Sequence, residues 1–243
     1  MDHKASVRER VWGALRDVAF PDSRFDFDFA EFIADFEGGE AACERLIADA
    51  AYQTARLIFI TPDNCLERLR HRALLDGKTV LVTTYSIKRG FWLLDPATIA
   101  PELLLYAATL DGMERVGRPV DLKAIAAMPP VDYLVTGTGA INHEGIRFGK
   151  GHGFFDVEWG MLYRLGRVGP DTPVAAVVHD CQLLDEDLVP DVFDTTADLV
   201  FTPTRTIRVA GAQKPDCGIL WDRLDPKMFA TIPPLQELKA MRL

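Results

Sequence analysis

The residues best suited to chemistry lie in a glycine-rich segment near the middle of the chain, GTGAINHEGIRFGKGHGFFDVEW. Gly149, Gly151 and Gly153 alternate with other residues there, and a helical run follows them. Arg147 and Lys150 lie within the same stretch. Glycine lets backbone N–H groups approach a ligand closely, while the basic side chains and the helix amino terminus add positive charge. This combination favours binding of a polyphosphate.

Two familiar phosphate-binding motifs do not fit this segment. GIRFGKG is one residue shorter than the Walker spacing and has Gly151 where Ser or Thr would hold magnesium. GTGAIN follows an apolar run but lacks the third glycine of the dinucleotide fingerprint. The remaining alternative is a simple turn with Asp156 as the N-cap of a helix. That alternative leaves Arg147 and Lys150 without a purpose.

The elements that must position this loop are read from the apolar pattern. We predict a first helix over 4–18 that ends before Pro21, a further helix over 40–52, and helical stretches over 65–75 and 101–110. The stretch FDFDFAEF suits a short strand, a loop or the opening of a helix through Phe36. Buried strands are predicted at RLIFIT, KTVLVTTY, VDYLVTG, TPVAAVVHD and ADLVFTP. Strands that alternate with helices predict an α/β fold, with a mainly parallel sheet covered by helices on both faces.

Ligands of such sheets bind beyond the carboxyl ends of the strands, and three polar segments follow predicted strands. These are residues 137–156, 179–187 and 202–205. We expect that His179, Asp180 and Cys181 do not all face one ligand, since successive side chains in an extended segment alternate in direction. His143 and Glu144 are expected in a turn that ends at Gly145, and the 202–205 segment is expected to cap a helix.

Composition excludes several classes of function. The 243 residues carry 27 Lys and Arg against 36 Asp and Glu, a net charge of −9, which argues against a nucleic-acid or anionic-membrane binder. No apolar run approaches a membrane span, and the charged amino terminus is unlike a secretion signal, so a cytoplasmic protein is expected. The four cysteines are expected to be reduced thiols. We expect one domain over 1–224, with 225–243 packing on it as a tail.

The loop resembles the signature R-x-G-x-G-x-G-Y-Y-D of the 5-formyltetrahydrofolate cyclo-ligase (methenyltetrahydrofolate synthetase) family. Here the motif runs from Arg147 to Asp156 as RFGKGHGFFD. The likeness covers most of the chain. Through RFGKGHGFFDVEWGML, VVHDCQLLDEDLVP and FTPTRTI it is most similar to the methenyltetrahydrofolate synthetase domain-containing branch. The resemblance implies a Rossmann-like fold of the kind shared by NagB, RpiA and coenzyme A transferases.

The resemblance also implies a site for ATP, magnesium and a folate. The residues implied to bind ATP are Lys4, Arg8, Arg147, Phe148, Gly149, Lys150, Gly151, His152, Gly153, Phe154 and Phe155. Those implied to bind the folate are Asp63, Lys150, Gly151, His152, Gly153, Phe154 and Gln182. Magnesium is implied at Asp156 and at Asp194, the first Asp of DTTAD. Arg147 and Lys150 are implied to stabilise charge on the phosphoryl oxygens.

The implied reaction converts 5-formyltetrahydrofolate and ATP to 5,10-methenyltetrahydrofolate. Three departures from the family pattern predict altered folate recognition: Phe154 and Phe155 replace two tyrosines, TGTGAIN replaces a proline-containing turn, and TPDNCLE offers Asp63 or Glu67 in place of a folate-binding glutamate.

The sequence leads to three functional hypotheses. The first is the cyclo-ligase or a close relative that acts on a similar formyl or amide substrate, as a monomer or homodimer. The second is a non-catalytic nucleotide- or folate-binding sensor or scaffold. The third, a sugar-phosphate isomerase or coenzyme A transferase, rests on analogy of fold alone.

Overall fold

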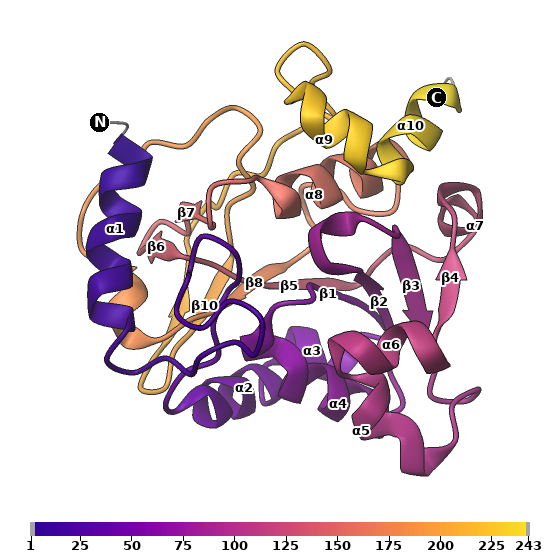
Figure 1. Ribbon diagram of the computed structural model, residues 1–243, viewed down its shortest axis with the longest axis horizontal. Coiled ribbons are helices and arrows are strands. Elements are labelled where there is room, and N and C mark those ends of the chain that lie inside the picture. The colour runs from indigo at the N-terminus through magenta and orange to yellow at the C-terminus, as the bar shows by residue number, and fades with distance from the viewer. Residues whose placement is uncertain (1–2, 242–243) are drawn as a thin grey trace.

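The computed structural model describes residues 3–241, and its centre is an eight-stranded sheet (Figure 1). The strand order is β11, β10, β8, β5, β1, β2, β3, β4. Five neighbouring strands are parallel: β1 (Leu57–Ile60), β2 (Thr79–Thr83), β5 (Tyr133–Gly137), β8 (Val174–Val177) and β10 (Leu199–Phe201). The edges are antiparallel: β3 (Phe91–Leu94), β4 (Arg118–Val120) and β11 (Thr206–Arg208). The predicted α/β fold with a mainly parallel sheet is confirmed.

The central strands are apolar without interruption because both faces of the sheet are covered. In β1, Ile58 and Ile60 belong to the hydrophobic core on one face, and Leu57 and Phe59 belong to the core on the other. Successive side chains of a strand point to opposite faces, so an unbroken run such as LIFI supplies both cores. Burying one such side chain fully contributes about 1.5–3 kcal/mol to stability.

Two groups of helices cover the sheet (Figure 1). One face carries α2 (Gly39–Ile47), α3 (Ala50–Thr54), α4 (Glu67–Leu75), α5 (Leu104–Ala107) and α6 (Leu110–Val116). The other face carries α7 (Leu122–Ala126), α8 (Phe154–Arg164), α9 (Pro226–Thr231) and α10 (Pro233–Ala240). No helix among residues 3–241 has the length and apolar character that crossing a bilayer requires.

The first helix, α1 (His3–Leu15), lies at one edge of the molecule beside a small three-stranded sheet (Figure 1). That sheet consists of β6 (Ala140–Asn142), β7 (Arg147–Phe148) and β9 (Leu183–Leu184). Val7 and Val11 of α1 are buried against Ala140 and Phe148. The apolar stripe of the helix therefore fixes α1 beside the glycine-rich loop, which continues from β7.

Two local expectations are corrected, and one set of alternatives is decided. The helix expected over 40–52 is divided, because the Asp49 carboxylate accepts a hydrogen bond from the Ala51 N–H and starts a new helix there. Residues 25–32 form turns, as the loop alternative held, and neither a regular strand nor a helix. The 202–205 segment caps no helix: the Thr202 N–H donates to the Arg205 carbonyl in a tight turn into β11.

The last residues of the described chain are attached through apolar contacts. Ile232, Leu235 and Leu238 are buried in the core on the α8 side of the sheet. The Glu237 carboxylate also accepts the Leu122 N–H at the start of α7, at 2.9 Å. Both kinds of contact hold α10 against the body of the protein.

Candidate active site

A cavity of about 380 Å³ lies beyond the carboxyl ends of β1, β2 and β5. Strands β2 and β5 flank β1 on opposite sides, so the chain leaves β1 at the point where the winding direction of the sheet reverses. Such a reversal separates the loops and leaves a crevice between them. The Asp63 carboxylate bridges it, since its Oδ2 accepts the Gly137 N–H at 2.9 Å. Residues 137–156 therefore reach the strand edge where the sequence predicted a ligand site.

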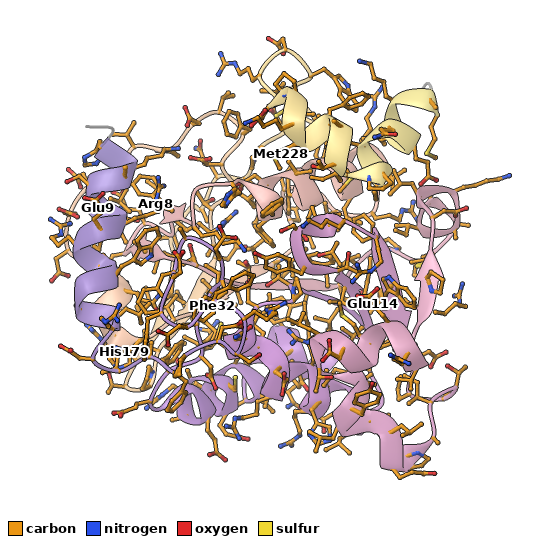
Figure 2. All side chains as sticks on the ribbon, in the orientation of Figure 1. Arg8, Glu9, Phe32, Glu114, His179 and Met228 are labelled. Atoms are coloured by element: carbon orange, nitrogen blue, oxygen red, sulfur yellow. The ribbon has the colours of Figure 1, made fainter. Side chains whose placement is uncertain are left out.

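The glycine-rich loop from Gly149 to Gly153 borders this cavity. Gly151 and Gly153 have φ angles of 108° and 70°, a region that side-chain-bearing residues rarely adopt. A Cβ at Gly151 would lie 3.5 Å from the Arg8 guanidinium, so the Arg8 side chain of α1 reaches the loop. Figure 2 shows Arg8 on the inner side of α1 and Glu9 on the outer side.

Arg147 and Asp156 form a buried ion pair at the start of α8. Arg147 Nη2 lies 2.5 Å from Asp156 Oδ1, and the two side chains are only 4% and 12% exposed. The same oxygen accepts the Thr195 N–H at 2.9 Å. Burial raises the pKa of the Asp156 carboxyl, while the Arg147 charge opposes that rise. The N-cap position of α8 is Gly153, so the alternative role of Asp156 as a simple N-cap is wrong.

The Arg147 guanidinium has hydrogen-bonding capacity that its ion pair with Asp156 does not use. Its guanidinium lies 4.3 Å from the centre of the Phe155 ring, and its buried Nε has no hydrogen-bond partner among the described residues. A buried donor without a partner is costly unless a ligand satisfies it. This feature fits an anionic ligand in the cavity.

Lys4 of α1 contacts two carboxylates of the 191–194 turn. Its Nζ lies 2.6 Å from both Asp191 Oδ2 and Asp194 Oδ2. Burial by itself lowers the pKa of Lys4, but the hydrogen bonds to Asp191 and Asp194 outweigh it and raise the pKa. All three residues line the cavity, so one predicted ATP contact and one predicted magnesium ligand meet here as partners.

Lys150 projects from the glycine loop into an aromatic surround. Its Nζ donates to the Glu31 carbonyl at 2.5 Å and lies 4.7 Å from the centre of the Tyr85 ring and 5.5 Å from that of Phe154. Burial lowers the pKa of this ammonium group. The rings attract the cation and also form apolar walls.

Two predicted aromatic contacts are mostly buried. Phe148 packs against Val7 and Val11, and Phe155 belongs to the core on the α8 side of the sheet. Both border the cavity, but little of either side chain is available to a ligand.

Apart from Glu67, the alternative offered for Asp63, Gln182 is the one predicted site residue that does not line the cavity, among those that the structure describes. It is 3% exposed, and its amide nitrogen donates to the Thr138 and Gly139 carbonyls at 2.6 and 3.1 Å. Its Oε1 accepts the His179 N–H. The amide thus holds the TGTG turn and lies outside the lining of the cavity.

The neighbours of Gln182 also serve the framework. The Asp180 carboxylate accepts hydrogen bonds from the Thr202 and Thr204 hydroxyls at 2.6 Å. His143 lies in a turn that ends at Gly145, whose φ is 75°, as the sequence predicted.

The cavity also contains a buried glutamate that the sequence did not single out. Glu158 lines the cavity, is 2% exposed, and accepts a hydrogen bond from the Thr83 hydroxyl. Burial raises its pKa to about 8. Asp63, the predicted folate ligand, lies in the same cavity, and burial also raises its pKa. A glutamate among the apolar residues of FFDVEWGML was the signal that could have identified Glu158.

The family model of 5-formyltetrahydrofolate cyclo-ligases matches residues 1–203 of the chain. The methenyltetrahydrofolate synthase domain-containing protein of Mus musculus is 34% identical over 240 residues, which cover 97% of this chain and 63% of the relative. The protein of the same name from Homo sapiens is 32% identical over 241 residues, or 98% and 61% of the two chains. The chain therefore spans about three fifths of the length of these relatives.

The fold has a solved counterpart in the 5,10-methenyltetrahydrofolate synthetase of Aquifex aeolicus. The two superpose with a TM-score of 0.51 over 87% of this chain and 95% of that one, at 17% sequence identity. At that identity the likeness concerns the fold alone.

Proposed function

Because this chain belongs to the 5-formyltetrahydrofolate cyclo-ligase family, we propose that it is a ligase-type enzyme that forms 5,10-methenyltetrahydrofolate, ADP and phosphate from 5-formyltetrahydrofolate and ATP. The observation that carries the proposal is the meeting of the glycine loop, Arg147 and Lys150 with Asp63 and Tyr85 in one cavity. The loop proposed to bind phosphate then lies beside an aromatic chamber, which is the part of the cavity that Tyr85 and Phe154 border. A cytoplasmic location and a monomeric or dimeric state remain expectations from the sequence.

The triphosphate would lie along the glycine loop. Arg8 faces Gly151 from α1, and the amino terminus of α8 directs N–H groups toward the same space. Lys4 would exchange part of its contact with Asp194 for a phosphate oxygen. The formyl group would then meet the γ-phosphate beside Lys150.

Asp156 and Asp194 would hold magnesium at the cavity wall. Residues 3–241 contain no group of three or more His, Cys, Asp or Glu placed to hold a metal, but Mg²⁺ commonly uses one or two carboxylates together with phosphates and waters. When bound, the ion would neutralise charge on the phosphates. The fit rests on two carboxylates that face the same cavity as the basic loop.

The chain's own groups would contribute positioning and electrostatics. In the proposed reaction the formyl oxygen attacks the γ-phosphorus and ADP leaves. N10 then attacks the activated carbon, the bond from that carbon to the phosphate oxygen breaks, and the departing phosphate takes up the proton that N10 loses. Arg147 and Lys150 would stabilise the charge on the phosphoryl oxygens. Tyr85 and Phe154 would enclose the ring system and exclude water from the activated carbon.

The proposal predicts methenyl product, followed by its absorbance, when purified protein receives ATP, magnesium and 5-formyltetrahydrofolate. Lys150→Ala should lower kcat/KM about 10- to 100-fold, since a charge-assisted contact contributes about 1.5–3 kcal/mol. Lys88→Ala removes an exposed lysine outside the cavity and should leave the rate unchanged. Equal rates for the wild type and Lys150→Ala would contradict the role given to this ammonium group.

Magnesium binding predicts a distinct result for Asp156→Asn. The variant should require a higher magnesium concentration for half-maximal turnover, with a smaller change in KM for ATP, because one charged ligand of the ion is lost. Turnover is measured over a magnesium titration, and exposed Asp187→Asn serves as the control. A parallel loss of ATP affinity at saturating magnesium would refute the assignment.

A non-catalytic nucleotide- or folate-binding role is the second candidate. One observation in its support is the ion pair between Lys4 and Asp194, in which the implied phosphate-binding residue and the implied magnesium ligand neutralise each other's charge. The other is that Phe154 and Phe155 lack the hydroxyl groups of the tyrosines in the family pattern. This candidate predicts a raised melting temperature with ATP, magnesium or folate but no product.

A further inference from the structure

The chain segment from Gln213 to Met228 completes one wall of the cavity, although it lies beyond residues 1–203 that match the family model. Its cavity-lining residues are Gly218, Ile219, Leu220, Arg223, Leu224, Asp225 and Met228. Figure 2 places Met228 on α9, across the ribbon from Arg8 on α1. The wall and the phosphate-facing helix thus come from opposite ends of the chain.

This wall is fastened to α8 and to the segment that precedes β10. The buried Trp159 indole N–H donates to the Pro215 carbonyl at 3.2 Å, and the Thr196 hydroxyl donates to the Gln213 carbonyl at 2.5 Å. Gly160 permits the close approach, because a Cβ there would lie 2.8 Å from Ile219 Cδ1. The segment therefore has a defined position relative to the glycine loop that precedes α8.

The inner surface of the wall is apolar and continues the surface of the loop. Ile219, Leu224 and Met228 pack against the same core as Phe154, whose ring borders the cavity. Phe154 also stacks on His152, with ring centres 5.4 Å apart. A flat aromatic group fits between such surfaces, next to the chamber proposed for the pterin ring.

Arg223 is the cation of this wall. Among the described cavity lysines and arginines, Lys4, Arg24 and Arg147 each form an ion pair, whereas Arg8, Lys150 and Arg223 form none, and of these three only Arg223 lies in the wall. The nearby Asp225 carboxylate accepts the Lys227 N–H and caps α9. Arg223 is exposed at the cavity mouth, so it can meet a carboxylate that extends from a ligand bound inside.

We infer that the 213–228 wall is a folate-tail subsite, in which Leu224 and Met228 contact the aminobenzoyl ring and Arg223 binds a carboxylate of the glutamyl group. The inference rests on the proposed function, because it assumes that the cavity accepts a reduced folate. The phosphate contacts on α1 and the glycine loop are separate from this wall, so the subsite should affect folate recognition without affecting ATP.

The test compares Arg223→Ala with Lys227→Ala, which removes an exposed cation of the same segment outside the cavity. Arg223→Ala should raise both the KM and the calorimetric Kd for 5-formyltetrahydrofolate about five- to tenfold, with the KM for ATP unchanged. Arg223→Lys should recover part of the loss. With 5-formyltetrahydropteroate, which lacks the glutamyl carboxylates, wild type and Arg223→Ala should bind equally. Lys227→Ala should match the wild type throughout.

The outcomes separate this subsite from the proposed reaction. Normal product formation with no effect of Arg223→Ala on either folate measurement would overturn the subsite alone. Folate binding that depends on Arg223 without any product would support the subsite and refute the reaction. A wild-type protein that binds no folate would overturn the subsite, whatever its nucleotide binding.

Discussion

Replacement of Arg147 by alanine is expected to lower the free energy of unfolding by about 3–5 kcal/mol, because it leaves the Asp156 carboxylate buried without its partner charge. The pair is well shielded from water, and the Thr195 N–H would remain as a donor to the carboxylate. Nucleotide affinity should fall as well, since the guanidinium is part of the proposed phosphate site. Urea denaturation at neutral pH measures the first effect, and calorimetry with magnesium–ATP measures the second.

A double-mutant cycle identifies the cause. Asp156→Asn should destabilise the wild type but restore stability in the Arg147→Ala background, because the uncompensated charge is then removed. Arg115→Ala, at an exposed arginine of α6 that forms no ion pair among the described residues, should change stability by less than about 0.5 kcal/mol. Additive effects of the two site substitutions would show that the ion pair is not coupled in solution.

Replacement of Glu158 by glutamine is expected to change the pH dependence of stability more than any other single substitution in the cavity. Burial raises the pKa of Glu158 from 4.5 to about 8, so the folded state holds a proton that the unfolded state releases. Stability linked to this group is fully present below pH 4.5 and is lost as the pH rises toward 8. Glutamine can still accept the Thr83 hydroxyl and carries no charge at any pH.

Between pH 5 and pH 8, the stability of Glu158→Gln relative to the wild type should therefore increase by about 3–4 kcal/mol. Urea unfolding at several pH values tests this directly. The matched control is Glu144→Gln, at an exposed glutamate of the 143–145 turn, which should follow the wild type at each pH. Parallel curves for Glu158→Gln and the wild type would mean that Glu158 is ionised in the folded protein at neutral pH.

The local elements could be predicted because local pattern determines them. LIFI and VAAV read as strands since a doubly covered parallel strand needs apolar residues at every position. The glycine loop is predicted to bind a ligand because glycine lets the backbone approach one closely, and Gly151 and Gly153 adopt positive φ angles that glycine permits. The division of the 40–52 helix at Asp49 was missed, since a side-chain cap within an apolar pattern leaves the pattern unchanged.

What the sequence determined by itself is the layered α/β fold, its five parallel strands, and the place of the glycine loop at the carboxyl edge of the sheet, because each follows from neighbouring residues and their periodicity. The tertiary structure alone decided which side chains meet. Thr83 and Glu158 are 75 positions apart, and Lys4 and Asp194 are 190 apart. Gln182 lies outside the cavity lining and Arg223 lies within it, because of contacts that no local pattern encodes. Burial, which sets the charge of Glu158, exists only once those distant segments have packed together.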